Sequence, residues 1–189
     1  MASTTIKEVC NNVAELELGD AISLPKGDVK KCALKFQGKP LSVQLNCKVA
    51  FEPSVYNGTG DEVRKGIVLR IADEDFALFT ELEAWCKQAL QEEVPNVDAL
   101  WSPSTRCNDK YGSQLKAKIT MGRGPYAVHY YDGSKASCDE PDCWRDLEVK
   151  VVLEVRGCYT QRTTVGMLLD VTHVQIEGSP LPPVVACPF

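Results

Sequence analysis

Apolar and polar residues alternate along two runs near the end of the chain, within residues 147–176. The apolar positions of these runs are Val149, Val151, Leu153, Val155, Val165, Met167, Leu169 and Val171. A period of two is typical of β-strands that turn one face into a core. The polar segment 157–164 between the runs predicts the bend of a long hairpin. Because an isolated hairpin is not stable in water, other strands must cover its apolar face.

Earlier segments carry the patterns of those other strands. Residues 31–36 and 41–51 flank a Gln-Gly-Lys-Pro turn and predict a second hairpin. The remaining strand segments are 66–71, 114–120 and 126–131, with at most a short strand within 18–24. Residues 52–65 contain one proline and two glycines in a polar setting, and they predict a loop.

A single helix is expected between the early and the late strands. Its apolar positions are Phe76, Phe79, Leu82, Cys86, Ala89 and Leu90, at helical spacing. Asp73 is a candidate N-cap, and Pro95 limits the helix. The pattern predicts a mainly β fold with one inserted helix, an antiparallel five-stranded OB-fold-like barrel with elaborated loops. A jelly roll is the main alternative, although it usually has more strands and no long helix.

The chain of 189 residues is long enough for one domain with a substantial core. We expect residues 1–29 to form an N-terminal lead-in, loose over 1–17, and residues 30–177 to form the OB-fold-like domain. Residues 178–189 are an apolar C-terminal tail that is too rich in proline for a helix or a central strand. No run of some 18 apolar residues occurs, and the first residues lead into charged positions. These features favour an intracellular protein that is not secreted and has no membrane partner.

Nine cysteines are spread over the chain. With no export signal, we expect free thiols, several of them buried in the core. Cys138 and Cys143 frame an Asp-Glu-Pro-Asp segment and resemble one half of a zinc site, but no second pair has ligand spacing. The two histidines, His129 and His173, are isolated in the sequence. We therefore expect no metal and no cofactor.

Charge is distributed in blocks, although the net charge is only −5. Residues 30–70 have 8 basic and 3 acidic side chains, a balance of +5, and residues 101–136 have 6 and 2, a balance of +4. Residues 71–100 have 1 basic and 8 acidic side chains, a balance of −7. Such blocks can form a basic face and an acidic face after folding, and the basic face would attract a polyanion.

Candidate chemistry comes from basic residues interleaved with aromatic ones. No catalytic or phosphate-loop motif is present, so we expect no enzyme. Cations that follow phosphates, beside rings that stack on bases, are typical of single-stranded nucleic-acid binding. The alternative is that the aromatic residues are buried and the lysines only protect a strand edge. The candidate binding residues are Lys48, Arg70, Trp101, Arg106, Tyr111, Lys116, Lys118, Arg123, Tyr126, Arg156, Tyr159 and Arg162.

Three segments within residues 30–177 resemble a known family. They are the helix with Asp73–Phe76 and Leu82–Trp85 followed by Leu100–Trp101, the segment 111–119 with its Leu-Lys-Ala-Lys-Ile core, and the hairpin of 155–159 with 165–169. Together they resemble the OB-fold single-stranded DNA-binding proteins of large eukaryotic DNA viruses, similar in plan to the T7-like phage protein. The resemblance implies a protein that coats single-stranded DNA in replication or recombination, with replication proteins as possible partners. It also implies location in the nucleus or at a viral replication site.

The C-terminal tail departs from the phage pattern. Phage-type proteins end in an acidic tail that closes on an aromatic residue, whereas residues 178–189 contain no acidic residue before Phe189. An apolar tail predicts docking on a second copy, and hence a homodimer. Two other classes stay open at this point. One is a viral or cellular β-barrel or jelly-roll assembly protein, and the other is a thiol or zinc hydrolase.

Overall fold

The computed structural model describes residues 4–24, 29–55, 63–122, 124 and 126–177. Ten strands and three α-helices lie within this described part. The strands are β1 (Leu16–Leu18), β2 (Ile22–Ser23), β3 (Lys30–Phe36), β4 (Lys39–Val49), β5 (Arg64–Arg70), β6 (Thr105–Asn108), β7 (Gly112–Thr120), β8 (His129–Tyr131), β9 (Glu148–Thr160) and β10 (Val165–Ile176). The helices are α1 (Ile6–Asn11), α2 (Asp73–Leu90) and α3 (Val97–Leu100), with a 3-10 turn, η1 (Val13–Glu15). No helix in the described ranges has the length and apolar character needed to cross a membrane.

The long hairpin of β9 and β10 is confirmed. Its strands pair antiparallel from Val165 opposite Thr160 to Ile176 opposite Val149. All eight apolar positions predicted for its inner face are buried. Burying alternate side chains of two long strands supplies a large apolar surface, which is the main favourable contribution to folding.

A bulge in β9 lets this strand pair with two different neighbours. Arg156 is skipped in the pairing with β10, between Val155 opposite Leu169 and Gly157 opposite Leu168. Before the bulge β9 pairs with β4, and after it with β3. Gly157 has φ +127°, and a Cβ there would lie 1.9 Å from the carbonyl oxygen of Cys32. Only glycine therefore permits this approach of β3 to β9.

The predicted hairpin of β3 and β4 is confirmed only at its turn. The two strands pair at Lys35 with Pro40 and at Phe36 with Lys39. Beyond this point they separate, because each strand pairs with its own part of β9.

Five strands form a closed circuit of pairings in the order β4, β5, β7, β10, β9 and back to β4. The prediction of a purely antiparallel barrel is wrong, because β7 and β10 run parallel, with Lys118 opposite Asp170 and Ile119 opposite Val171. Strand β8 is also parallel to β10. The other strands extend this circuit into one mixed sheet, so the structure is larger than a five-stranded barrel.

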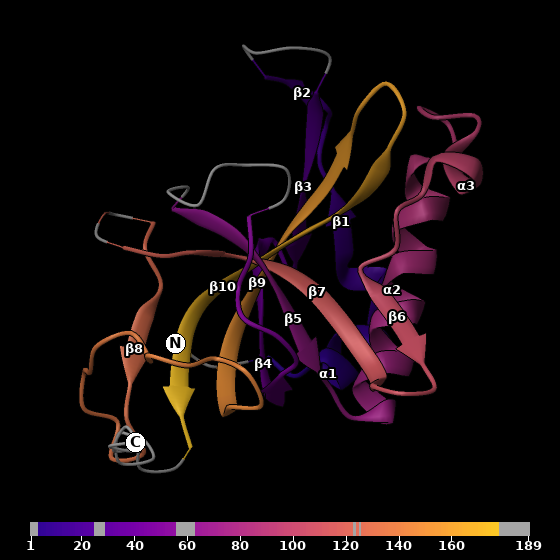
Figure 1. Cartoon of the computed structure of the whole chain (residues 1–189). Helices are drawn as coiled ribbons and strands as arrows, with labels where there is room; N and C mark the ends of the chain where they lie inside the picture. The colour runs from indigo at the N-terminus through magenta and orange to yellow at the C-terminus, as the bar shows by residue number, and fades with distance from the viewer. Residues whose placement is uncertain (1–3, 25–28, 56–62, 123, 125, 178–189) are drawn as a thin grey trace, which may run out of the picture.

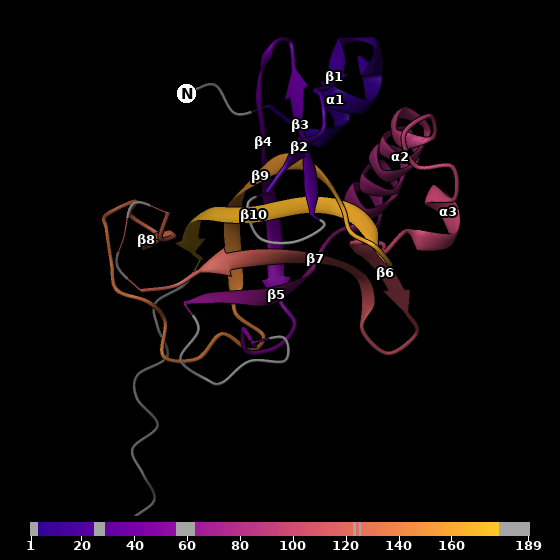
Figure 2. The same cartoon turned by 90° about the horizontal axis from the view of Figure 1, so that it is seen from above.

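Helix α2 lies beside this sheet, on the side away from β8 (Figures 1 and 2). Its buried face contains Phe79, Leu82, Cys86 and Leu90, as the periodicity predicts. The predicted N-cap is wrong, since the cap residue is Ala72 and no side chain caps the helix. The carboxylate of Asp73 instead accepts a hydrogen bond of 2.7 Å from Ser113 Oγ on β7, which ties the start of α2 to the sheet.

The described part of the N-terminal segment is packed, which corrects the prediction of a loose lead-in over 1–17. Ile6 and Val9 of α1 are buried, and Cys10 Sγ donates to the Leu78 carbonyl of α2 at 3.3 Å. Strands β1 and β2 pair with β3. The boundaries of the three predicted segments remain a prediction, and the tail 178–189 lies outside the described residues.

Cysteines contribute to the core as predicted. Cys32 of β3, Cys86 of α2 and Cys158 of β9 are fully buried, and Cys32 lies opposite Cys158. These small thiols sit at the point where the helix meets the two strands, so they act there as small apolar side chains.

Candidate nucleic-acid interface

The outer faces of β5 and β7 form a continuous surface, the β5–β7 face. Alternation turns Leu115, Ala117 and Ile119 into the core and puts the even-numbered side chains of β7 on the other side, where Lys116 and Lys118 are exposed but Gln114 is buried. The residues of the face, paired across the two strands, are Arg64 with Thr120, Gly66 with Lys118, Val68 with Lys116 and Arg70 with Gln114. Six residue steps along β7 make this face about 20 Å long.

Lys116 and Lys118 are the most available cations of the β5–β7 face. Both are exposed, and neither lies within 4 Å of an acidic oxygen in the described part of the chain. Gly66 has no side chain to cover Lys118 from the neighbouring strand. Two unpaired positive charges thus stand in the middle of the face, where a polyanion meets them without first displacing an acidic partner.

Cations at the Gln114 end of the face form ion pairs with acidic side chains. Arg70 Nη1 lies 3.1 Å from Asp146 Oδ1, and Lys48, opposite Arg70, lies 3.7 Å from Glu148. The ring of Tyr111 is approached by the Arg70 guanidinium at 5.6 Å. The same ring lies 5.1 Å from the Lys110 ammonium and 5.3 Å from the Phe51 ring. Arg106 of β6 is exposed and pairs with Gln114, so it extends this end of the face.

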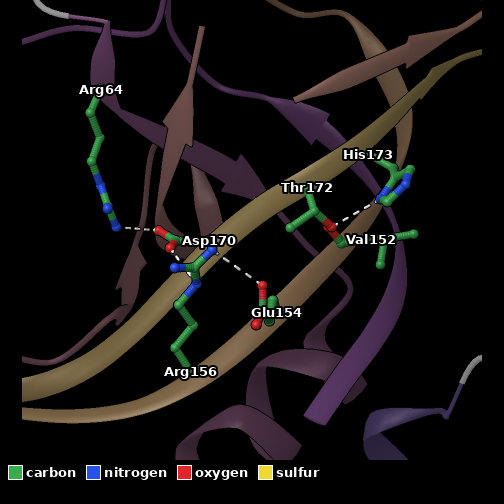
Figure 3. A network of polar contacts seen from close by, with 7 residues as sticks. All are labelled: Arg64, Val152, Glu154, Arg156, Asp170, Thr172 and His173. Atoms are coloured by element: carbon green, nitrogen blue, oxygen red, sulfur yellow. Dashed lines mark hydrogen bonds and ion pairs between the residues drawn. The ribbon is translucent and has the colours of Figure 1, made fainter. Parts of the chain in front are cut away.

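A hollow of about 360 Å³ lies at the Thr120 end of the face. It is lined by Val63, Arg64, Thr120, Tyr126, Arg156, Asp170, Val171 and Thr172. Figure 3 shows that the guanidinium groups of Arg64 and Arg156 approach the carboxylate of Asp170 from two directions. Arg156 Nε lies 2.8 Å from Asp170 Oδ2, and Arg156 Nη2 lies 3.3 Å from Glu154 Oε2. The network links three strands, with Arg64 on β5, Asp170 on β10 and the other two on β9.

A loop occupies the gap where β7 and β10 diverge. The Ser102 N–H donates to the Val165 carbonyl of β10, and the Lys116 N–H donates to the Ser104 carbonyl, each at 2.7 Å. The carboxyl group of Glu83 on α2 holds this loop by accepting from the Ser104 N–H at 2.6 Å and from Thr105 Oγ1 at 2.9 Å. The backbone of Lys116 is therefore fixed through the loop to α2.

Trp101, Tyr159 and Arg162 lie away from the β5–β7 face. The Trp101 ring lies 5.5 Å from Lys87 Nζ of α2. Tyr159 lies opposite Gly166, and partial burial raises the pKa of its hydroxyl group. Arg162 lines a separate hollow with Lys30 and Glu93.

The structure thus brings Arg70, Lys116, Lys118, Tyr126 and Arg156 to one face of the sheet. Arg106 and Tyr111 lie at the Gln114 end of this face, Trp101 and Tyr159 do not lie on it, and Arg123 lies outside the described residues. The part that each predicted residue plays in binding stays a prediction.

Sequence reasoning missed Arg64 and Asp170. The sequence pattern predicts a loop at Arg64, whereas this residue begins β5 and lies on the same face as Gly66, Val68 and Arg70. The spacing of two between these residues is the sequence pattern that could have placed Arg64 on a strand. Asp170 is a polar position inside the predicted second run, and the sequence contains no sign of the two arginines that meet it.

The two histidines of the chain are neighbours in space. His129 of β8 lies opposite His173 of β10, with ring centroids 5.2 Å apart. Burial and then the charge of His129 lower the pKa of His173. No group of three or more His, Cys, Asp or Glu side chains within the described ranges has the arrangement to hold a metal ion.

Comparison with known proteins identifies the fold. No protein-family model and no curated protein sequence match the chain. Its structure is similar to gp2.5, a single-stranded DNA-binding protein encoded by bacteriophage T7, with a TM-score of 0.55 and 11% identity over 78% of this chain and 91% of that chain. It is also similar to the single-stranded DNA-binding protein of bacteriophage Enc34 in complex with single-stranded DNA. That match has a TM-score of 0.51 and 9% identity, and it covers 88% of this chain and 98% of that chain. The predicted likeness to phage proteins of this plan is therefore confirmed for the fold.

Proposed function

We propose that this protein binds single-stranded DNA without catalysis and coats it during replication or recombination. The observation that carries the proposal is the pair of unpaired lysines, Lys116 and Lys118, at the centre of the β5–β7 face. We interpret the closed circuit of five strands as OB-fold-like, and in an OB-fold the face of the second and third strands binds oligonucleotides. Counted from β4, these strands are β5 and β7.

Binding on this face combines two physical terms. Phosphates are attracted by the lysines and by Arg106, and each neutralised phosphate releases counterions into solution. Exposed aromatic rings add base stacking, which is tolerant of sequence. The negative net charge of the chain does not oppose this, because the local field of a basic face decides where a polyanion binds.

The alternative functions have weaker support. A thiol enzyme requires an accessible thiolate, and burial argues against two of the cysteines, since it raises the pKa of Cys10 to about 11 and that of Cys47 to about 12. An assembly protein of the β-barrel or jelly-roll class would not need a basic face with unpaired lysines. Three parts of the proposal rest on the sequence resemblance: replication proteins as partners, a nuclear or viral replication site, and a eukaryotic viral origin. A homodimer is a further part, and it rests on the apolar character of the tail, residues 178–189.

Fluorescence anisotropy of a labelled thymidine oligomer of about 30 nucleotides, a length that spans at least one OB-fold site, tests the proposal against a duplex of equal length. We expect tighter binding to the single strand, with an affinity that falls steeply as salt is raised. Equal binding of both DNAs, or no binding at low salt, would contradict the proposal.

A further inference from the structure

The hollow at the Thr120 end of the β5–β7 face combines exposed apolar groups with arginines. In the described part of the chain four large hydrophobic side chains are markedly exposed, and two of them, Val63 at 52% and Tyr126 at 76%, line this hollow. Burying such groups against a flat apolar ligand is favourable, and the ring of Tyr126 would pack best against another aromatic ring.

The charged network in the hollow is neutral as a whole. Arg64 and Arg156 contribute two positive charges, and Asp170 and Glu154 contribute two negative ones, for a sum of zero. The side chain of Asp170 is only 9% exposed, whereas those of Arg64 and Arg156 are 47% and 39% exposed. The carboxylate therefore holds two guanidinium groups in position while parts of both still face solvent.

Donors remain on these guanidinium groups. A guanidinium has five N–H donors in a planar fork. Within the described residues Arg64 donates only through Nη2, to Asp170, and Arg156 uses Nε and Nη2 in the network. The hydroxyl groups of Thr120 and Thr172 lie in the same lining. The hollow thus offers an aromatic side, fixed N–H donors and hydroxyl groups within one small volume.

We propose that this hollow is a subsite for a single unstacked nucleotide. The base packs against Tyr126 and Val63, and a phosphate oxygen accepts hydrogen bonds from Arg64 and Arg156, which Asp170 positions. This inference rests on the proposed function and adds a reason for preference for the single strand. A base enters the hollow only when it is unpaired, since pairing and stacking in a duplex hide its faces.

The neutral network gives this subsite a distinct thermodynamic signature. Stacking and hydrogen bonding to a neutral cluster release few counterions, whereas lysines that neutralise phosphates release many. Tyr126→Ala is expected to weaken binding of a thymidine oligomer by about 5- to 150-fold, the range for loss of one stacked base. The slope of log affinity against log salt should stay at the wild-type value.

Anisotropy titrations of the full chain at four salt concentrations test the subsite. The variants are Tyr126→Ala, Tyr126→Phe, which keeps the ring, and Ile22→Ala as a matched control. Ile22 is 66% exposed on β2, outside the hollow. We expect wild-type affinity for Tyr126→Phe and Ile22→Ala. Because Tyr126 is so exposed, its replacement should leave the fold intact.

The outcomes separate the two proposals. If the wild-type protein binds the oligomer and Tyr126→Ala binds it equally tightly, the subsite proposal is wrong and the proposed function stands. A weaker Tyr126→Ala whose salt slope also falls would overturn the subsite too, because the ring would then act through phosphate contacts. If the wild-type protein itself does not bind single-stranded DNA, both the proposed function and the subsite proposal are wrong.

Discussion

Two buried carboxyl groups, Glu83 and Asp170, play opposite parts in this molecule. The Glu83 residue is 4% exposed, and Asp170 is 7% exposed. Glu83 accepts hydrogen bonds from neutral donors, the N–H groups of Ser104 and Thr105 and the hydroxyl of Thr105. Asp170 is instead held by two guanidinium groups, those of Arg64 and Arg156.

The difference lies in where the partners point. All partners of Glu83 are buried, so this group joins α2 to the loop before β6 in the interior of the protein. The partners of Asp170 are partly exposed and line a hollow on the outer face. A buried acidic residue that organises other buried groups serves the fold, whereas one that organises exposed cations serves a surface. Changes at Glu83 should therefore alter stability, and changes at Asp170 should alter binding.

Glu83→Ala is expected to have the largest effect. It leaves two N–H groups and one hydroxyl without a buried acceptor, and we expect a loss of roughly 2–4 kcal/mol in the free energy of unfolding. Urea unfolding followed by circular dichroism measures the loss. Glu83→Gln keeps an acceptor oxygen and should lose less. DNA affinity of the folded protein should change by less than about twofold, so a large loss of affinity without loss of stability would reverse the assignment.

Asp170→Asn is expected to have a smaller effect on stability. Both arginines are more than one third exposed, so solvent screens the ion pairs, and we expect a loss of about 1 kcal/mol. The substitution makes the network in the hollow positive by one charge. The slope of log affinity against log salt for single-stranded DNA should therefore steepen by about 0.7. An unchanged slope, measured by anisotropy, would show that the network does not meet phosphate.

The smallest expected effect is a change of stability with pH. His173 lies on β10 three residues after Asp170 and faces His129, the Tyr131 ring and the Thr172 hydroxyl. Its pKa is lowered in the folded protein, first by burial and then by His129. The unfolded chain therefore binds more protons than the folded protein near pH 6. The contribution of His173 to the free energy of unfolding is fully present above about pH 6.5, and it is lost as pH falls through the pKa of His173 in the folded protein.

Urea unfolding at pH 7.5 and pH 5.5 checks this effect. His129→Gln should reduce the pH dependence, since it removes one neighbour that disfavours protonation of His173. If the variant lost stability on acidification to the same extent as the wild type, His129 would have no part in it.

The sequence was informative where structure follows from local periodicity. The alternation in β9 and β10 predicted which side chains enter the core. The same alternation in β7 explains why Lys116 and Lys118 point outward. Helix α2 was predicted for the same reason, except for its N-cap, since the carboxylate of Asp73 accepts a hydrogen bond from Ser113 on a distant strand and does not cap the helix. These features depend on side chains a few residues apart.

Features that depend on long-range pairing could not be read in this way. The parallel contact of β7 with β10 joins residues about 50 positions apart, and no local pattern reports it. Arg64 and Asp170 are 106 positions apart, so their ion pair was invisible, as was the meeting of His129 with His173. The hollow is made by these contacts, and for this reason only two of its residues, Tyr126 and Arg156, were among the predicted site residues.

The most direct test of the central claim is the salt dependence of single-stranded DNA binding by the wild type and by Lys116→Ala with Lys118→Ala. If these lysines meet phosphates, the double variant should bind more weakly at low salt, and its slope should be shallower by about 1.4, or 0.7 for each lost contact. Its stability should stay within about 0.5 kcal/mol of the wild type, since both side chains are exposed. Equal affinities and parallel salt plots for the two proteins would contradict the assignment of the β5–β7 face as the binding surface.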